Sequence, residues 1–333
     1  MAGKPQVTRP TPAHILIIGS GAVGAVYARY LVKAGCLVSF LARNNNSANA
    51  QMPRTLHHYP LLGKAREERQ NLPVITDAGA GHFDQVWLCL PSTALDNPWL
   101  QQQLDRLRGC PALVAWTPDV ADMDKLASQY PGSIAQGLIG LISFQTPLPG
   151  YETPTPGIGF LAPPRSAVLD NSDAGRLAAR LLKHGGLPAT TSADLPWLEG
   201  RLAAATICAV AGLEAAGWSL KGFSGSAWLP LAADAGIEAT RITGQYLGRS
   251  VSRPMAGPRK LALKTIMTLG PRVMPFDLET YLHYHFAKVG DQTRQILAAW
   301  ISRGQTQGLP TSALESLASA LTDLSARATE HAA

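Results

Sequence analysis

The stretch that decides the fold is HILIIGSGAVGAVYARYLVKAG, from His14 to Gly35. A short apolar run enters a glycine-rich turn, and small and apolar residues at helical spacing follow it. Gly19, Gly21 and Gly24 form the pattern G-x-G-x-x-G. In such a pattern the first glycine allows a tight turn, the second allows a ligand to approach the backbone, and the third lets the helix lie close to the sheet. The stretch therefore predicts a strand, a glycine turn and a helix, in that order.

Free backbone amides at the start of a helix, together with the helix dipole, favour a negatively charged ligand. The turn follows an apolar strand, opens a helix and leads to a second strand, so it predicts a dinucleotide site. A tight turn without a ligand is the alternative. The residues predicted to contact the dinucleotide in this turn are Gly19, Ser20, Gly21, Ala22, Val23 and Gly24.

The second predicted strand ends at LARNNN, residues 41–46. At this distance from the turn, an acidic residue would hold the ribose 2′-hydroxyl group of NAD. Arg43 stands there instead, and no carboxylate follows until Glu67. An arginine can clamp a 2′-phosphate and stack on adenine. The sequence therefore predicts NADP(H) as the cofactor, and the alternative is that Arg43 only ends a strand at the surface.

Short apolar runs recur at residues 37–42, 74–77, 85–90 and 112–116. Runs of this length are typical of a parallel sheet buried on both faces, and helical stretches such as 22–34 and 120–130 lie between them. The fold class predicted is α/β, an N-terminal Rossmann-like doubly wound sheet followed by a C-terminal all-helical domain. Residues 133–162 are extended and proline-rich, and we expect antiparallel strands there.

The predicted organisation is a flexible tail over 1–12, a dinucleotide-binding domain over 13–165, and a helical substrate and dimerisation domain over 166–330. From Asp170 onward the pattern is mostly helical. Residues 195–218 are apolar around most of the helix circumference, which predicts a buried central helix. Residues 275–304 repeat apolar positions at helical spacing and predict one long helix with a single core stripe.

Composition excludes several classes of protein. The chain has 333 residues, of which 46% are hydrophobic, so two ordered domains are expected. No apolar run reaches the roughly 18 residues that span a bilayer, and the N-terminus lacks a signal-peptide core, so we predict a cytoplasmic protein without membrane contact. The four cysteines are far apart, and no cysteine and histidine residues have zinc spacing, which predicts free thiols and no metal.

The formal charge of +6 is unevenly distributed, because the stretch from Arg241 to Arg272 holds seven Lys and Arg residues and no Asp or Glu. No nucleic-acid-binding motif accompanies this stretch, so nucleic acid is not predicted as a partner. A solvated basic face is the simplest interpretation. A surface that attracts an anionic cofactor or substrate is the alternative.

The stretch ILIIGSGAVG, Arg43 and the order of the two domains resemble the ketopantoate reductase (2-dehydropantoate 2-reductase) family. The late segment RGQTQGLPTSALESL, residues 303–317, is similar to the family's GI-x-x-P segment after its last long helix. The resemblance implies NADPH-dependent reduction of a 2-keto acid to a 2-hydroxy acid, a small carbonyl or carboxylate substrate, and a helical domain like that of 6-phosphogluconate dehydrogenases. A homodimer is also expected, because the second domain is rich in apolar helices.

The residues that would carry this chemistry differ from the family pattern. In the family, a lysine in the motif W-x-K-L on the central helix donates the proton, and asparagines follow one and two turns later. Here Arg201 takes the place of the lysine, and Ala205 and Ala209 take the places of the asparagines. Ketopantoate itself is therefore not the predicted substrate.

Three further positions also differ in residue type from the family pattern. Gln292 stands where the family has a substrate-anchoring glutamate. Leu90 ends the fourth predicted strand, and Pro91 follows it, where the family has a lysine. Thr117 follows the fifth predicted strand, where the family has an Asn-Gly pair. Leu90, Pro91 and Thr117 remain predicted cofactor contacts because of their place at the ends of the strands.

A polar cluster in HYHFAKVGDQTRQ, residues 283–295, could replace the lost acid. On one continuous helix, His285, Lys288 and Gln292 would share a face. Lys288 or His285 would then supply the proton, and Arg201 would polarise the carbonyl oxygen or hold a carboxylate. The predicted catalytic residues are thus Lys288, Arg201, His285 and Gln292. A solvated ion pair of Lys288 with Asp291, and histidines that only pack at the helix rim, are the alternatives.

The sequence therefore predicts an NADPH-dependent oxidoreductase similar to ketopantoate reductases. A dinucleotide-binding protein without turnover, acting as a sensor or an assembly partner, is the second hypothesis, since fold alone does not determine function. An opine-type dehydrogenase, which also joins a Rossmann domain to a helical one, is a third.

Overall fold

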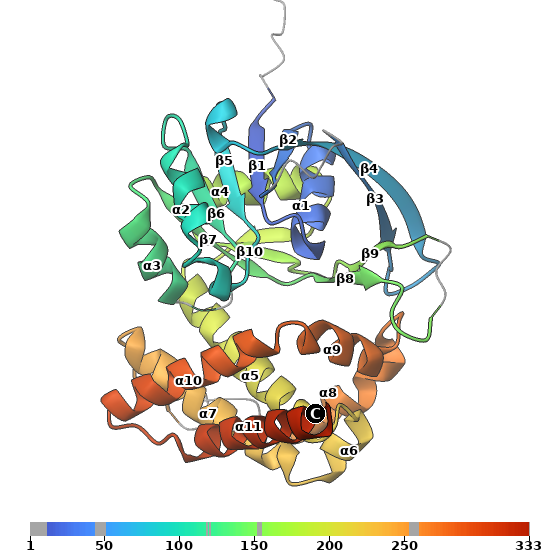
Figure 1. Ribbon diagram of the computed structural model, residues 1–333, viewed down its shortest axis with the longest axis vertical. Helices are drawn as coiled ribbons and strands as arrows, with labels where there is room; N and C mark the ends of the chain where they lie inside the picture. The colour runs from blue at the N-terminus through green and yellow to red at the C-terminus, as the bar shows by residue number, and fades with distance from the viewer. Residues whose placement is uncertain are drawn as a thin grey trace, which may run out of the picture.

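The computed structural model of the 333-residue chain describes residues 12–43, 51–117, 119, 121–151, 155–252 and 260–332. Figure 1 shows a sheet flanked by helices above a second group of helices, and α5 (Leu195–Ala215) leads from the first part into the second. The predicted tail, residues 1–12, lies outside the described residues except for its last position. No helix in the described ranges is long and apolar enough to cross a membrane.

Five parallel strands form the middle of the sheet. β1 lies between β2 and β5, and β6 and β7 follow on the β5 side. Residues Ile15 to Ile18 of β1 are at most 1% exposed, as expected for a strand covered on both faces. The five strands are β1 (His14–Ile18), β2 (Leu37–Leu41), β5 (Gln85–Leu88), β6 (Ala112–Ala115) and β7 (Ile134–Ile139).

Two hydrophobic layers enclose these strands and confirm the predicted doubly wound architecture. α1 (Ala22–Lys33) and α4 (Asp173–His184) cover one face. α2 (Pro98–Asp105) and α3 (Ala121–Gln129) cover the other, where Leu104 and Leu126 are buried. Short 3-10 turns, Ala78–Ala80 and Ser92–Ala94, flank β5.

A hairpin of β3 (Gln51–His58) and β4 (Arg66–Ile75) extends the sheet beyond β2. The sequence predicted only its last residues, as a strand over 74–77. Residues 66–70 of β4 read REERQ and are largely exposed, so they carry no apolar run that would mark a strand. β9 (Gly157–Leu161) pairs in parallel with β3, and β8 (Ile142–Thr146) pairs antiparallel with β9 at the edge, as expected for the extended segment.

The sheet continues past the expected domain boundary at residue 165. β10 (Ala167–Leu169) pairs antiparallel with β7, and β11 (Ala189–Thr191) pairs in parallel with β10. With α4 between them, these strands belong to the sheet part of the molecule, and the helical part begins at α5. Strands of three residues are too short to leave a periodic signal in the sequence.

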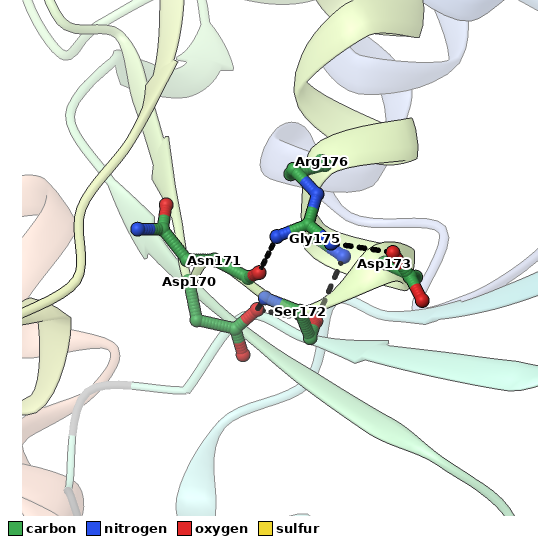
Figure 2. Close-up of polar contacts among 6 residues, drawn as sticks. All are labelled: Asp170, Asn171, Ser172, Asp173, Gly175 and Arg176. Atoms are coloured by element: carbon green, nitrogen blue, oxygen red, sulfur yellow. Dashed lines mark hydrogen bonds and ion pairs between the residues drawn. The ribbon is translucent and has the colours of Figure 1, made fainter.

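Figure 2 shows the polar contacts between the segment that follows β10 and the first turn of α4. Ser172 Oγ accepts a hydrogen bond from the Gly175 amide at 3.0 Å and donates one to Asp170 Oδ1 at 2.5 Å. Asp170 Oδ2 accepts a hydrogen bond from the Gln136 amide at 2.6 Å, which joins the end of β10 to β7. A Cβ atom on Gly175 would lie 2.3 Å from Asp170 Oδ1, so the close approach requires glycine.

The helical part is built around α5, which packs against α7, α10 and α11. Ala204, Cys208 and Ala211 of α5 are buried, which confirms the predicted central helix. The other helices are α6 (Leu220–Gly225), α7 (Trp228–Tyr246), α8 (Lys260–Val273), α9 (Leu278–Ala287), α10 (Gly290–Thr306) and α11 (Ser312–Ala332).

The prediction of one long helix over 275–304 is wrong, because the chain breaks between α9 and α10. Val289 leaves the helical region at φ −114° and ψ 21°. A β-branched residue followed by Gly290 has low helix propensity, which explains the position of the break. Lys288 therefore caps the end of α9, and Gln292 lies in the first turn of α10.

Candidate functional site

The three glycines of the turn between β1 and α1 have different surroundings. Gly19 has φ +107°, and a Cβ atom there would lie 2.2 Å from the Cys89 carbonyl oxygen. A Cβ atom on Gly24 would lie 2.1 Å from the Gly19 carbonyl oxygen. A Cβ atom on Gly21 would meet nothing within 4 Å. The first and third glycines are thus required by the protein's own packing, whereas the second faces open space.

The N-terminus of α1 has the properties that a diphosphate requires. Gly21 is the N-cap residue and has no side chain to occupy the first amides of the helix, and the first turn carries no acidic residue. Uncapped amides and the helix dipole favour an anion at this point. The residues present therefore fit a dinucleotide.

A cavity of about 500 Å³, which we call the cleft, opens between this turn and the helical part. The turn, the end of β5, and the break between α9 and α10 all contribute to its wall. The structure thereby brings together two sets of residues that are far apart in sequence. The predicted residues that line the cleft are Gly21, Ala22, Val23, Leu90 and Pro91 from the sheet part, and His285, Lys288 and Gln292 from the helical part.

Other predicted cofactor residues lie outside the lining of the cleft. Arg43 is exposed at the end of β2, with its Cζ atom 5.5 Å from the centroid of the Trp99 ring. Thr117 is 2% exposed after β6. Gly19, Ser20 and Gly24 form the turn without lining the cleft.

Arg201 is not brought to the cleft. It is exposed on α5, and its Cζ atom lies 5.6 Å from the centroid of the Trp197 ring. Glu199, which is 2% exposed, faces the sheet part instead and accepts a hydrogen bond from Gln136 Nε2. Burial raises the pKa of the Glu199 carboxyl group well above its usual range.

Lys288 and His285 form the ionisable part of the helical wall. The Lys288 Nζ atom lies 3.6 Å from the centroid of the Tyr284 ring, a cation–π contact. Burial, and secondarily the charge of Lys288, lower the pKa of His285 below its ordinary value. His285 is therefore neutral at pH 7.

Two buried polar atoms of the cleft wall lack a hydrogen-bond partner within the described part of the chain: Trp116 Nε1 and Ser143 Oγ. Leaving a buried donor unsatisfied costs about 1–3 kcal/mol, but both atoms are covered by protein, so neither is exposed to a ligand in the cleft. Neither residue was predicted from the sequence, because Trp116 ends an apolar run and Ser143 lies in a strand without a motif.

Arg54 on β3 is a further residue near the turn that the sequence did not point to. Its Nη1 atom donates a hydrogen bond to the Ser20 carbonyl oxygen, and its Cζ atom lies 4.9 Å from the centroid of the Phe40 ring. Burial lowers the pKa of the guanidinium group. Arg54 was missed because β3 itself was not predicted, and its contact places a cation beside the glycine turn.

Two sets of contacts join the sheet part to the helical part. On one side, Arg303 of α10 lies 3.3 Å from Asp119, which follows β6. On the other side, the Phe144 ring of β8 lies 5.3 Å from the Tyr281 ring of α9 and 4.9 Å from the Phe276 ring. The first contact is polar and the second is aromatic, so the cleft is fixed by two different kinds of interaction.

The fold and the cleft define a two-part protein in which a dinucleotide-type turn faces a helical domain. Residues 15–109 match the family model described as ketopantoate reductase PanE/ApbA, which confirms the resemblance over the N-terminal third. No curated protein matches the chain. In the described residues, no group of three or more His, Cys, Asp or Glu side chains is placed to hold a metal ion.

Solved structures extend the likeness over nearly the whole chain. The chain is similar to a PanE/ApbA family ketopantoate reductase from Ralstonia eutropha, at 19% identity and a TM-score of 0.66, covering 92% of this chain and 96% of that one. A dimeric ketopantoate reductase from Staphylococcus aureus has 14% identity, a TM-score of 0.67, and coverage of 93% and 98%. D-mandelate dehydrogenase solved with NADH has 15% identity, a TM-score of 0.65, and the same coverage. At these identities the comparison shows a ketopantoate reductase-like fold.

Proposed function

We propose that this chain is an NADPH-dependent reductase of 2-oxo acids other than ketopantoate. The observation that supports it is the cleft, in which the uncapped start of α1 and the polar group His285, Lys288 and Gln292 line one cavity. A glycine turn that binds no dinucleotide would not account for a lysine and a histidine on the opposite wall of the cavity. The likeness to ketopantoate reductases and to a D-mandelate dehydrogenase, which are named for 2-oxo or 2-hydroxy acids, is consistent with this class of substrate.

Gly21, Ala22 and Val23 would hold the diphosphate of the cofactor through their position at the start of α1. Arg43, lying over Trp99, would hold the 2′-phosphate, which is why we propose NADPH rather than NADH. Bound there, the nicotinamide would supply a hydride to the carbonyl carbon.

The carbonyl oxygen gains negative charge as the hydride arrives, and it then requires a proton. We assign this donation to the Lys288 ammonium group, which becomes an amine and recovers its proton from water. Gln292 and the neutral ring of His285 would orient the substrate by hydrogen bonds. Arg201, exposed and outside the cleft, has no part in this scheme.

The electrostatics of the cleft favour an acid as the substrate. Its lining, as far as the chain is described, contains Lys288 and His285 but no aspartate or glutamate. Apolar side chains such as Trp116, Ile139 and Ile207 make up much of the remaining wall. A carboxylate next to the keto group and an apolar side chain beyond it match this distribution.

The test is calorimetry with NADPH and NADH, followed by NADPH oxidation with ketopantoate, 2-oxobutanoate and 2-oxo-3-phenylpropanoate. We expect tighter binding of NADPH and oxidation with at least one of the last two acids. NADPH binding without oxidation by a broad panel of 2-oxo acids would favour the dinucleotide-binding protein without turnover. Absence of binding to either nucleotide would contradict both hypotheses. The predicted cytoplasmic location and homodimer stay predictions.

A further inference from the structure

A second cavity of about 560 Å³, which we call the outer hollow, adjoins the cleft. Tyr284 and Lys288 line both cavities, so they form the boundary between them. Trp218 and His283 contribute aromatic surface to the outer hollow. A ligand held at Lys288 in the cleft can therefore extend past Tyr284 into this space.

Trp218 is held in an unusual conformation at the wall of the outer hollow. Its φ angle is +63°, in the left-handed region that bulky residues rarely adopt, and Gly217 before it has φ +71°. The two residues close the C-terminal turn of α5, where the Trp218 amide donates a hydrogen bond to the Leu213 carbonyl oxygen at 2.9 Å. The result is an indole ring stacked on the His283 ring, with a centroid distance of 5.1 Å and an interplanar angle of 17°.

The charges around the outer hollow restrict what it can hold. Glu279 lines it and accepts a hydrogen bond from the Leu220 amide at 2.7 Å. A second carboxylate at the far end of a ligand would meet this negative charge, whereas a neutral ring would not. Lys288 also lies at the boundary, where its ammonium group can contact the face of a ring as it now contacts Tyr284.

From these observations we infer that the substrate is a 2-oxo acid whose side chain ends in a neutral aromatic ring. This inference rests on the proposed function. The carboxylate and keto group lie at Lys288 in the cleft, and the side chain passes Tyr284. The ring lies in the outer hollow against the stacked pair of Trp218 and His283.

The inference is tested by the ratio of kcat/KM for 2-oxo-4-phenylbutanoate to that for 2-oxobutanoate. We expect a ratio of about ten or more in the parent protein. His283→Ala, on the exposed side of α9, should lower the ratio about threefold to tenfold, the value of one aromatic contact. Trp218→Ala should lower it similarly, and Trp218→Phe should retain most of it. His184→Ala, exposed on α4, is the matched control and should leave the ratio unchanged.

A parent ratio near one, or the same ratio in the parent, His283→Ala and Trp218→Ala proteins, would overturn the inference. A binding measurement separates this failure from failure of the proposed function. Calorimetry with 4-phenylbutanoate, which has the carboxylate and the ring but no keto group, requires no turnover. If no acid is reduced but His283→Ala weakens this binding, the result supports binding of the ring in the outer hollow and contradicts the proposed reductase activity. Equal affinity of the parent and His283→Ala proteins for 4-phenylbutanoate would overturn the inference that the outer hollow binds the ring.

Discussion

The two walls of the cleft differ in how they are built. At the glycine turn the sheet wall presents backbone amides, which are placed by the close packing of Gly19 and Gly24. The helical wall presents side chains, among them Lys288 and His285, at a break between two helices. A backbone site depends on local geometry and tolerates little change, whereas a side-chain site can change its chemistry by substitution.

The largest effect is expected on the helical wall. Lys288→Ala should lower kcat/KM for a reduced 2-oxo acid by about 100-fold or more, because general acid catalysis contributes about 10²–10⁴. Steady-state rates with NADPH measure it, and Lys264→Ala on α8, also an exposed lysine, is the matched control. Turnover of Lys288→Ala within threefold of the parent would assign the proton donor elsewhere.

On the sheet wall, the same substitution at two glycines should have opposite consequences. Gly24→Ser forces a Cβ atom to within 2.1 Å of a carbonyl oxygen and should cost about 1–3 kcal/mol or more in unfolding free energy. Gly21→Ser enters open space and caps α1, so it should preserve stability. It should weaken NADPH binding about tenfold to 100-fold, because its side chain competes for the amides. Thermal unfolding and calorimetry together check this, and equal effects of both variants would contradict it.

Arg43→Ala should have a smaller and more selective effect. Removing a charge-assisted contact to the 2′-phosphate should weaken NADPH binding about tenfold while leaving NADH binding nearly unchanged. Calorimetry with both nucleotides measures this, and Arg180→Ala, exposed on α4, is the control. A parallel loss for both nucleotides would mean that Arg43 acts on adenine stacking rather than on the phosphate.

The smallest effect concerns pH. Burial and the charge of Lys288 lower the pKa of His285 in the folded chain, whereas the unfolded chain keeps the ordinary value near 6.5. Below that pH the unfolded state binds more protons, so stability falls from about pH 6.5 downward through the depressed folded pKa. His285→Gln should flatten the unfolding free energy over this acidic range. Denaturant unfolding at several pH values tests it, and parallel curves for parent and variant would contradict it.

The sequence was sufficient where the signal is local. The strand, turn and helix around Gly19–Gly24 follow from adjacent residues, and the apolar runs predicted β1, β2, β5 and β6. The hairpin of β3 and β4 was missed because REERQ carries charge rather than apolar residues, and its register depends on partners elsewhere in the sheet. Local pattern therefore predicted the middle strands of the sheet and the glycine turn.

The residues that form the helical wall depend on which side of each helix faces the cleft, and the sequence indicates this only weakly. α5 is apolar on nearly all sides, so nothing in it shows which side faces the sheet. Arg201 and Glu199 are two residues apart, which is about 200° around a helix. Their side chains therefore point to opposite sides of α5, and the sequence does not show which of them faces the sheet. The break at Val289 likewise moves Lys288 and Gln292 off a common helical face, yet both still line the cleft.

The aromatic contact of Phe144 with Tyr281 and Phe276 links the stability of the two parts. Phe144 is 3% exposed and Tyr281 is 7% exposed in the complete chain. A fragment that ends after β11 would keep every strand of the described sheet but would uncover Phe144 and Leu148 at its edge strand. Exposed apolar surface beside an unprotected strand edge promotes aggregation. The helical part therefore covers an apolar edge of the sheet part, independently of any contribution to the chemistry of the cleft.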